Sequence, residues 1–456
     1  MISLEGEEFG KLLERAIGAE NVSRASVAFK EAPAVSVRLN PSKTDGGFAG
    51  RVFGSGLVSV PWSRHGYILP TRPSFTLDPC FHAGCYYVQE SSAMYVGEVS
   101  RSVLPRFEGL GRPVRVLDLC AAPGGKTTDL ATSLRQVFGD SFILVANEVM
   151  KGRAGILADN VALWGDPNVL VTSADPKAFS VMEGFFDIIV ADVPCSGEGM
   201  FRKDPKALED WSVDLVNLCA SRQKRIVSDV WPALRQGGAL VYSTCTFEEA
   251  ENDANVEWIA ENLGAGIISR EMPEGIIKTR TGGLLVPGFV PGEGQFAAAL
   301  VKTSASTEAR RRSRPKSKKV EALPRSPLFE GIEEMVTMKG GLLVYVPKVI
   351  AEEAEALEAL RPIRSGVAVG TVKGHDVVPD SDFALMAGRG EPFPTVDLEK
   401  NEALRYLRRE SVFVEGKPKG YLTVRYDGHP LGFVKNLGTR WNNLHPQGRR
   451  IRMEID

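Results

Sequence analysis

Two cysteines follow the ends of two apolar segments in this 456-residue chain. Cys195 stands in Asp-Val-Pro-Cys, just after the run at 186–192, and Cys245 stands in Ser-Thr-Cys-Thr, just after the run at 238–244. A cysteine thiolate is a strong nucleophile that can form a covalent intermediate with a substrate. A buried cysteine can serve simply as a small apolar side chain. That alternative poorly explains two thiols at strand ends beside Asp192. We therefore expect Cys195, Cys245 and Asp192 to share one catalytic site.

A turn rich in small residues follows the first apolar run of the same region and reads Asp118-Leu-Cys-Ala-Ala-Pro-Gly-Gly-Lys-Thr-Thr128. Small residues at the end of a strand let the backbone approach a ligand closely. The Gly-Lys-Thr at 125–127 is like the end of a triphosphate-binding loop, but that motif needs glycine where Cys120 stands, so we reject it. The predicted ligand contacts are Cys120, Ala121, Ala122, Pro123, Gly124, Gly125 and Lys126.

One acidic residue closes the second apolar run, and another follows the third. Glu148 is placed to accept hydrogen bonds from both hydroxyls of a ribose, and Asp175 to meet an adenine amino group. Either acid alone could equally cap a helix. Together with the small-residue turn, they indicate a ligand that contains adenosine but no pyrophosphate.

The segments that must position these residues alternate between short apolar runs and helix-length stretches. The apolar runs lie at 114–120, 141–148, 168–172, 186–192 and 238–244, and the helical stretches include 127–138, 152–164 and 214–234. Continuous apolar strands alternating with helices indicate a parallel sheet that is covered on both faces. The sequence therefore predicts a Rossmann-like, doubly wound α/β domain that ends near Lys302.

The rest of the chain divides by composition into further units. We expect an N-terminal domain at 1–95, a linker rich in Ser, Pro, Arg and Lys at 303–327, an intermediate domain at 328–397 with a helix at 349–360, and a basic module of strands at 398–456. Within the module, Asp427-Gly428 predicts a hairpin. Residues 310–319 carry seven positive charges and no negative one, which fits either a solvated linker or a contact with a phosphate backbone.

Composition excludes several classes of protein. Hydrophobic residues make up 43% and charged residues 25%, the balance of an ordinary globular chain. No apolar run reaches the ~18 residues of a membrane span, and the first residues do not resemble a signal peptide, so we expect a cytoplasmic protein without membrane contact. The six cysteines form no CxxC pair and the five histidines are dispersed, so we expect neither a metal site nor disulfides. We also expect a monomer.

Three motifs resemble those of the NOL1/NOP2/Sun family of S-adenosylmethionine-dependent RNA cytosine-5 methyltransferases. They are Asp-Leu-Cys-Ala-Ala-Pro-Gly-Gly-Lys, Asp-Val-Pro-Cys-Ser-Gly-Glu-Gly-Met-Phe-Arg-Lys and Ser-Thr-Cys-Thr. The Gly-Met-Phe-Arg-Lys at 199–203 is most similar to a bacterial subgroup that acts on small-subunit (16S) ribosomal RNA. The resemblance extends to Arg38-Leu-Asn-Pro41 and to 84–90, and it implies an N-terminal RNA-binding domain, a class I methyltransferase domain at 96–302 and a PUA-like RNA-binding module at the C-terminal end.

The resemblance also implies roles for the site residues. Cys245 would add to C6 of the cytosine, which makes C5 nucleophilic enough to take a methyl group. Asp192 would bind the N3 and amino edge of the base, and Cys195 would help to remove the C5 proton so that Cys245 is released. The small-residue turn, Glu148, Asp175 and Asp192 would bind S-adenosylmethionine. Lys126 is a candidate cation for stabilising the thiolate.

Some alternatives stay open. Members of the family often carry histidine at the positions of Gly288 and Gln295, so a substrate contact from these two residues is in doubt. The RNA partner is 16S ribosomal RNA, free or in the small ribosomal subunit, or else a transfer RNA. A non-catalytic ribosome-assembly protein could use the same fold as a scaffold. The presence of both Cys195 and Cys245 favours an enzyme, because RNA binding needs neither thiol.

Overall fold

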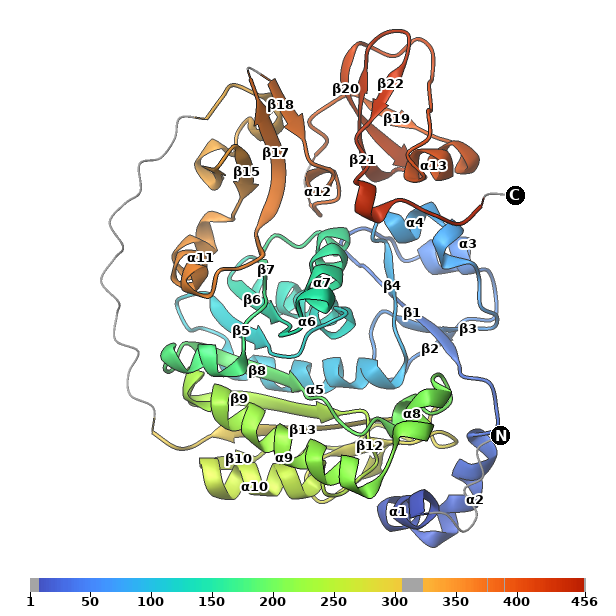
Figure 1. The fold of residues 1–456 in the computed structure, drawn as a ribbon, viewed down its shortest axis with the longest axis vertical. Helices are drawn as coiled ribbons and strands as arrows, with labels where there is room; N and C mark the ends of the chain where they lie inside the picture. The colour runs from blue at the N-terminus through green and yellow to red at the C-terminus, as the bar shows by residue number, and fades with distance from the viewer. Residues whose placement is uncertain (1–7, 306–322, 375, 389, 455–456) are drawn as a thin grey trace.

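The computed structural model describes residues 8–305 and 323–454, apart from 375 and 389. The described residues form four sheets, and a ten-stranded sheet lies at the centre of the molecule (Figure 1). The N-terminal sheet lies beside it, and two C-terminal sheets lie together at one end. The basic run at 310–319 lies outside the described residues.

Five parallel strands form the middle of the central sheet in the order β9-β8-β5-β6-β7, and β13 pairs antiparallel with β9. Their bounds are β5 Val114–Asp118, β6 Phe142–Asn147, β7 Val169–Thr172, β8 Phe186–Asp192, β9 Leu234–Thr244 and β13 Gln295–Lys302. All of β6 is buried, and its alternate residues belong to two separate apolar clusters, as expected for a sheet covered on both faces. The prediction of a doubly wound α/β domain is confirmed.

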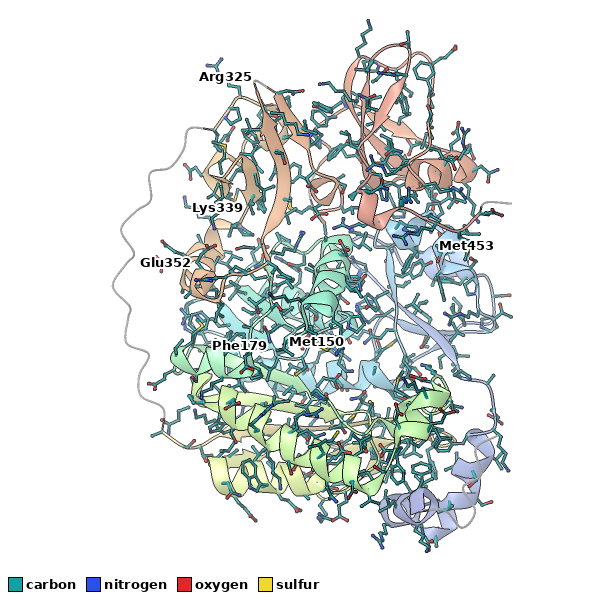
Figure 2. The ribbon with its side chains drawn as sticks, in the orientation of Figure 1. Met150, Phe179, Arg325, Lys339, Glu352 and Met453 are labelled. Carbon is teal, nitrogen blue, oxygen red and sulfur yellow. The ribbon has the colours of Figure 1, made fainter. Side chains whose placement is uncertain are left out.

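The helices that cover this sheet lie close to the predicted stretches. They are α5 Tyr95–Val103, α6 Gly125–Phe138, α7 Lys151–Trp164, α9 Val213–Val230 and α10 Asp253–Leu263, with the short α8 Pro205–Asp210 before α9. The predicted helix at 214–234 ends early because Pro232 cannot continue it, and a 3-10 turn at Trp231–Ala233 leads into β9. A 3-10 turn, η4 Pro176–Val181, follows β7, and its Phe179 is fully buried (Figure 2).

Short strands extend the central sheet at both edges. On the β13 side they are β10 Ala265–Ile267, β11 Ile277–Lys278 and β12 Gly283–Leu285. On the other side, β16 Arg364–Ser365 pairs antiparallel with β7. The segment predicted as an intermediate domain therefore also adds a strand to the central sheet.

The intermediate segment forms a sheet of its own in the order β14-β15-β17-β18. Its elements are β14 Val336–Lys339, β15 Leu342–Tyr345, α11 Ala351–Leu357, β17 Val367–Lys373, β18 Asp376–Pro379 and α12 Ser381–Ala384. The helix predicted at 349–360 is shorter than expected, because 3-10 turns at Lys348–Ile350 and Glu358–Leu360 replace its ends.

The N-terminal sheet is antiparallel and has the order β2-β3-β1-β4. Its elements are β1 Val35–Leu39, α3 Phe48–Phe53, β2 Val58–Ser59, β3 Gly66–Leu69, α4 Pro79–His82 and β4 Tyr86–Val88. The preceding helices, α1 Glu8–Ile17 and α2 Ala19–Ala28, pack instead on the central domain, where Phe9 contacts Phe201 and lies in the same apolar cluster as Phe247.

The C-terminal module is a sheet in the order β19-β20-β21-β22 with one α-helix. Its elements are β19 Thr395–Asp397, α13 Lys400–Leu407, β20 Gly420–Tyr426, β21 His429–Asn436 and β22 Trp441–Asn443. Its first strand thus begins before residue 398. The predicted hairpin at Asp427-Gly428 is present, with positive φ at both residues, as the tight turn requires.

The N-terminal sheet and the C-terminal module share one hydrophobic core. Val37 and Tyr86 of the sheet belong to the same buried cluster as Leu404, Leu422 and Val424 of the module. The N-terminal sheet and the C-terminal module are therefore packed against each other, although they are far apart in the sequence (Figure 1).

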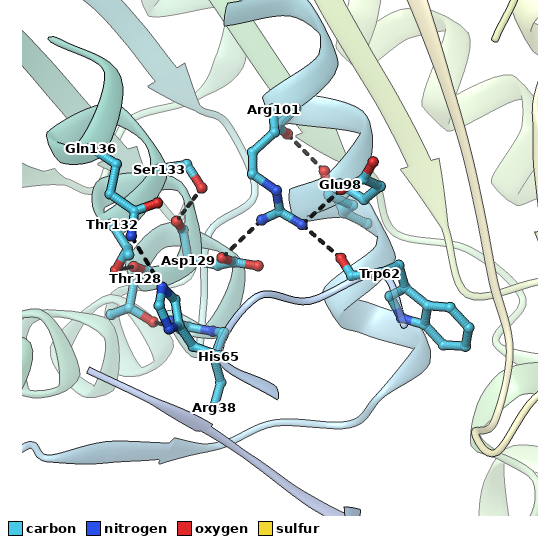
Figure 3. Close-up of polar contacts among 12 residues, drawn as sticks. Arg38, Trp62, His65, Glu98, Arg101, Thr128, Asp129, Thr132, Ser133 and Gln136 are labelled. Carbon is cyan, nitrogen blue, oxygen red and sulfur yellow. Dashed lines mark hydrogen bonds and ion pairs between the residues drawn. The ribbon is translucent and has the colours of Figure 1, made fainter. Parts of the chain in front are cut away.

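Two arginines also anchor the N-terminal sheet to the central domain (Figure 3). Arg38 of β1 donates to the carbonyl of Gly125 at 3.1 Å and to Thr128 Oγ1 at 2.5 Å, both in the first turn of α6. Arg101 of α5 donates to the Trp62 carbonyl at 2.6 Å and pairs with Asp129 of α6 at 3.5 Å. The start of α6 is thereby fixed by the N-terminal sheet.

Within the described ranges, no helix is both long and apolar enough to cross a membrane. The same residues contain no group of three His, Cys, Asp or Glu side chains arranged to hold a metal ion.

Candidate active site

The ends of β8 and β9 bring the two cysteines together. These strands are adjacent and parallel, so the loops that follow them leave the same edge of the sheet. Cys195 Sγ lies 3.2 Å from Cys245 Sγ, and the backbone N–H of Cys245 donates to Cys195 Sγ at 3.3 Å. Both residues are half-buried. One thiol can therefore donate a hydrogen bond to the other sulfur.

The surroundings of the pair raise the pKa of one of its thiols, that of Cys195. The hydrogen bond with Cys245, together with burial, raises the pKa of Cys195 well above its ordinary value, and the nearby carboxyls of Glu251 and Glu198 raise it further. Cys195 therefore favours its protonated form, and its S–H can donate to Cys245 Sγ.

Asp192, the last residue of β8, is oriented by three side chains. Lys126 Nζ donates to its Oδ2 at 2.8 Å, whereas Ser243 Oγ and Gln295 Nε2 donate to its Oδ1 at 2.8 and 3.2 Å. Gln295 also donates to the Thr244 carbonyl at 2.8 Å, which ties it to the end of β9. The carboxylate is thus held at the strand ends that carry both cysteines.

Lys126 provides a cation at this edge of the sheet. Burial alone would lower its pKa, but the carboxylate of Asp192 and the nearby Cys245 outweigh that effect and raise the pKa above its ordinary value. Lys126 is therefore charged at neutral pH, and its charge favours the thiolate form of a neighbouring cysteine.

The small-residue turn forms a cradle between β5 and α6. Gly124 has φ 115°, a conformation that other residues rarely adopt, and a Cβ on Gly125 would lie 3.2 Å from the Tyr87 ring. Residues of α7 hold the turn from the other side: Arg153 donates to the Ala122 carbonyl and Asn160 to the Pro123 carbonyl, each at 2.8 Å. The turn is therefore tightly packed against its neighbours and held in one conformation. Cys120 and Ala121 begin this turn, and burial raises the pKa of the Cys120 thiol.

Three acidic residues lie around this turn, and they differ in their burial and in their hydrogen bonds. Asp118 accepts from Thr127 Oγ1 at 2.7 Å, its other oxygen is buried without a partner among the described residues, and burial raises its pKa to about 7. Glu148 is 4% exposed and accepts from the backbone N–H of Met150 at 2.9 Å. Asp175 is exposed and caps η4 through the N–H of Lys177 at 2.9 Å.

Several residues of the site are not evident from the sequence. Ser243 is the register partner of Asp192 on the neighbouring strand β9, a pairing that only the folded sheet shows. Gln295 reaches Asp192 directly, although its substrate contact was in doubt. Gly288 has another role: its φ is 91°, and its carbonyl accepts from Arg24 Nε at 2.7 Å. Met150 lies beside Glu148 and is 59% exposed (Figure 2).

The strand order, the cradle after β5 and the acid after β6 define a methyltransferase domain. Family models agree along most of the chain. Residues 112–301 match the model described as 16S rRNA methyltransferase RsmB/F, residues 6–91 match the N-terminal domain of 16S rRNA methyltransferase RsmF, and residues 393–451 match the methyltransferase RsmF PUA domain.

Curated relatives and solved structures agree with these matches. Ribosomal RNA small subunit methyltransferase F of Enterobacter sp. (strain 638) is 31% identical over 86% of this chain and 84% of its own, and that of Escherichia coli O157:H7 is 29% identical over 90% and 89%. A methyltransferase homolog protein from Pyrococcus horikoshii superposes with a TM-score of 0.55 at 26% identity, covering 66% of this chain and 96% of its own. NSun6 of the same organism gives 0.53 at 18% identity, over 65% and 98%. The chain belongs to the 16S rRNA methyltransferase RsmB/F family.

Proposed function

We propose that this protein transfers a methyl group from S-adenosylmethionine to C5 of a cytosine in 16S ribosomal RNA through a covalent bond between Cys245 and C6. The observation that carries the proposal is the thiol pair, 3.2 Å apart and next to the Asp192 carboxylate. A protein that only bound RNA would need neither thiol.

The residues around the cradle fit S-adenosylmethionine. The unpartnered buried oxygen of Asp118 suits the amino group of the ligand's methionine part, and buried Glu148 suits the ribose hydroxyls. The small residues at 121–125 allow a ligand to approach the backbone closely, with Cys120 to Lys126 lining the turn, and Asp175 and Asp192 complete the set. When bound, the ligand supplies an electrophilic methyl group.

Cys245 and Asp192 act first on the cytosine. The Cys245 thiolate adds to C6, and the electron pair of the C5=C6 bond shifts toward N3, where Asp192, once it has taken up a proton, binds the N3 and amino edge and stabilises the adduct. C5 of the adduct would then bond to the methyl group, and the methyl–sulfur bonding pair would stay on the ligand's sulfur. Lys126 contacts Asp192, and its positive charge stabilises negatively charged groups at this edge of the sheet. Ser243 and Gln295 keep Asp192 in place.

Cys195 acts in the release of the methylated base. The C5 proton leaves to water, its bonding pair restores the C5=C6 double bond, and the C6–Sγ pair returns to Cys245 as a thiolate. Cys195 keeps its proton and lies 3.2 Å from this sulfur, so its S–H is placed to stabilise the departing thiolate by a hydrogen bond. This role differs from the expected one, removal of the C5 proton, which would need Cys195 as a thiolate.

The RNA substrate is inferred from the family. The relatives are named for the small ribosomal subunit, and the chain matches both the N-terminal and the PUA domain models of that group. A cytosine must leave its stack to reach the thiols, so single-stranded or loosely paired RNA is preferred. We place the protein in the cytoplasm because that is where its RNA would be found in a bacterium.

The test is to supply labelled S-adenosylmethionine with purified 16S ribosomal RNA, small subunits and transfer RNA, and to map the product by bisulfite sequencing. We expect label at C5 of cytosine in the ribosomal RNA or the subunit. Labelling of transfer RNA alone would mean that the protein performs the same chemistry on a different substrate. No transfer to any of the three RNAs would favour a non-catalytic role in ribosome assembly.

A further inference from the structure

The backbone on both sides of Cys195 is held by buried side chains from outside the catalytic set. On the N-terminal side, Gln223 of α9 donates from Nε2 to the Pro194 carbonyl at 3.0 Å. On the C-terminal side, the N–H of Ser196 donates to Glu251 Oε2 at 3.2 Å, and Ser196 Oγ also donates to Glu251. Cys195 therefore lies between two anchored peptide groups.

Gln223 and Glu251 also fix each other. Gln223 Nε2 donates to Glu251 Oε2 at 2.6 Å, and both residues are 0% exposed. The other end of the Gln223 amide accepts from Asn255 Nδ2 at 2.7 Å and lies 3.0 Å from Tyr242 OH, so turning the amide over would set its NH₂ against that of Asn255. Buried polar groups that satisfy one another in this way rigidify their surroundings.

This pair connects the two loops that carry the thiols. Glu251 lies after Cys245, between β9 and α10, and its carbonyl accepts from Tyr242 OH of β9 at 2.6 Å. The segment 193–197, which carries Cys195, has no helix or strand of its own. The distance between the two sulfurs therefore depends on side chains that hold this segment to the β9 end.

We propose that Gln223 and Glu251 are positioning residues that hold the Cys195 S–H against Cys245 while the methylated base is released. The inference rests on the proposed function and adds to it two residues that reach the reaction only through Cys195. A displacement of about 1 Å in a reacting group can cost about 100-fold in rate, so the effect should be large and confined to one step.

Two substitutions at Glu251 separate position from charge. Glu251→Asp keeps the charge but shortens the side chain, so it cannot reach Ser196 and Gln223 together. Glu251→Gln loses the charge but keeps the length: its oxygen can accept from Gln223 and the Ser196 N–H, and its NH₂ can donate to Ser196 Oγ. We expect Glu251→Asp to resolve the RNA adduct about 10- to 100-fold more slowly than the unsubstituted protein. We expect Glu251→Gln to resolve it within a few fold of the normal rate.

The measurement is the decay of the covalent protein–RNA adduct on a denaturing gel, in a single turnover with S-adenosylmethionine and 16S ribosomal RNA. Gln223→Met, similar in length but apolar, should also slow the decay. Glu248→Asp is the matched control, a buried carboxyl of the same loop, and should decay normally. Calorimetric binding of S-adenosylmethionine should change little in Glu251→Asp, whereas general damage to the fold would weaken it.

The outcomes separate this inference from the proposed function. If Cys195→Ala forms no adduct, covalent catalysis itself is wrong. If Cys195→Ala accumulates adduct but Glu251→Asp and Gln223→Met release it at the normal rate, the positioning role is wrong. If Glu251→Gln accumulates adduct and Glu251→Asp does not, the carboxylate acts through its charge, and the positioning role is again overturned.

Discussion

Each sulfur of the thiol pair has a separate task in the proposed reaction, and single substitutions can tell the tasks apart. Cys245→Ala should abolish methylation and leave binding of S-adenosylmethionine within a few fold, because the thiol acts on the base. Cys195→Ala should still methylate but stall before release, so a denaturing gel should show an RNA adduct that requires S-adenosylmethionine. The double variant should show none. Trapping by Cys245→Ala instead would exchange the two roles.

The protonation of Cys195 predicts how release depends on pH. Its hydrogen bond with Cys245 and its burial raise its pKa well above the ordinary value. A thiol that acts as a donor works below its pKa, so adduct decay should be constant from about pH 6 to 9 and fall only at higher pH. A thiol that removed the C5 proton would instead speed decay as the pH rises toward that pKa. Quenched single-turnover reactions over this range distinguish the two.

Glu148 is the residue on which the predicted ribose contact depends. It is buried, and a hydrogen bond from the Met150 N–H holds its carboxylate. Glu148→Ala should weaken binding of S-adenosylmethionine by about 1 to 3 kcal/mol, measured by calorimetry, because the ribose hydroxyls lose their acceptor. Asp159→Ala on α7, whose carboxylate pairs with Arg449, is the control and should bind normally. Equal affinities for Glu148→Ala and the unsubstituted protein would exclude the contact.

At the scale of the elements, the sequence predicts the parallel sheet well, because its apolar runs and small-residue turns are local signals. Pro232 marks the end of α9, although the prediction extended the helix past it. The partners of Asp192 could not be predicted as fully, because Gln295 comes from β13, about 100 residues further along, and reaches the site only through the pairing of β13 with β9. The roles of Gln223 and Glu251 could not be predicted either. The sequence marks them only as residues of a helix and a loop, and their contacts form only when the chain folds.

The junction between β1 and α6 predicts a strong stability effect at one residue. Arg38 is 1% exposed and donates to Gln89 Oε1 as well as to the first turn of α6. Arg38→Lys removes the forked donors, so the free energy of unfolding should fall by about 1.5 to 3 kcal/mol. The exposed pair of Arg51 with Asp45 supplies the control, since Arg51→Lys should cost less than about 1 kcal/mol. Denaturant unfolding of both variants compares them, and equal losses would show that Arg38 is no anchor.

At the scale of the whole molecule, the division into successive domains remains a prediction. Two of the predicted units contribute to the sheet or the core of another unit. The intermediate segment contributes β16 to the central sheet, and the C-terminal module completes the core of the N-terminal sheet. These contacts join residues hundreds of positions apart, so no local sequence pattern predicts them.

Surface substitutions are therefore a cleaner test of RNA docking than removal of the module, which would uncover the N-terminal sheet. Lys417, Lys419 and Arg440 are exposed on the module. Replacing all three with alanine should weaken RNA binding and make the dependence of log affinity on log salt shallower by about 2, with the melting temperature unchanged. Lys339→Ala with Lys348→Ala on the intermediate segment is the control pair. An unchanged salt slope in the triple variant would place the docking surface elsewhere.

The core shared by the N-terminal sheet and the C-terminal module sets the order in which this protein can mature during translation. Residues 35–88 are synthesised first, but the apolar face that they present is buried by residues 396–451, which follow about 300 residues later. Until then the N-terminal sheet exposes hydrophobic surface, the condition in which partly made chains aggregate or recruit chaperones. The central domain meanwhile has all its own strands except β16 once Lys302 has emerged. A nascent chain would thus complete most of its methyl-transfer centre well before the N-terminal sheet is closed.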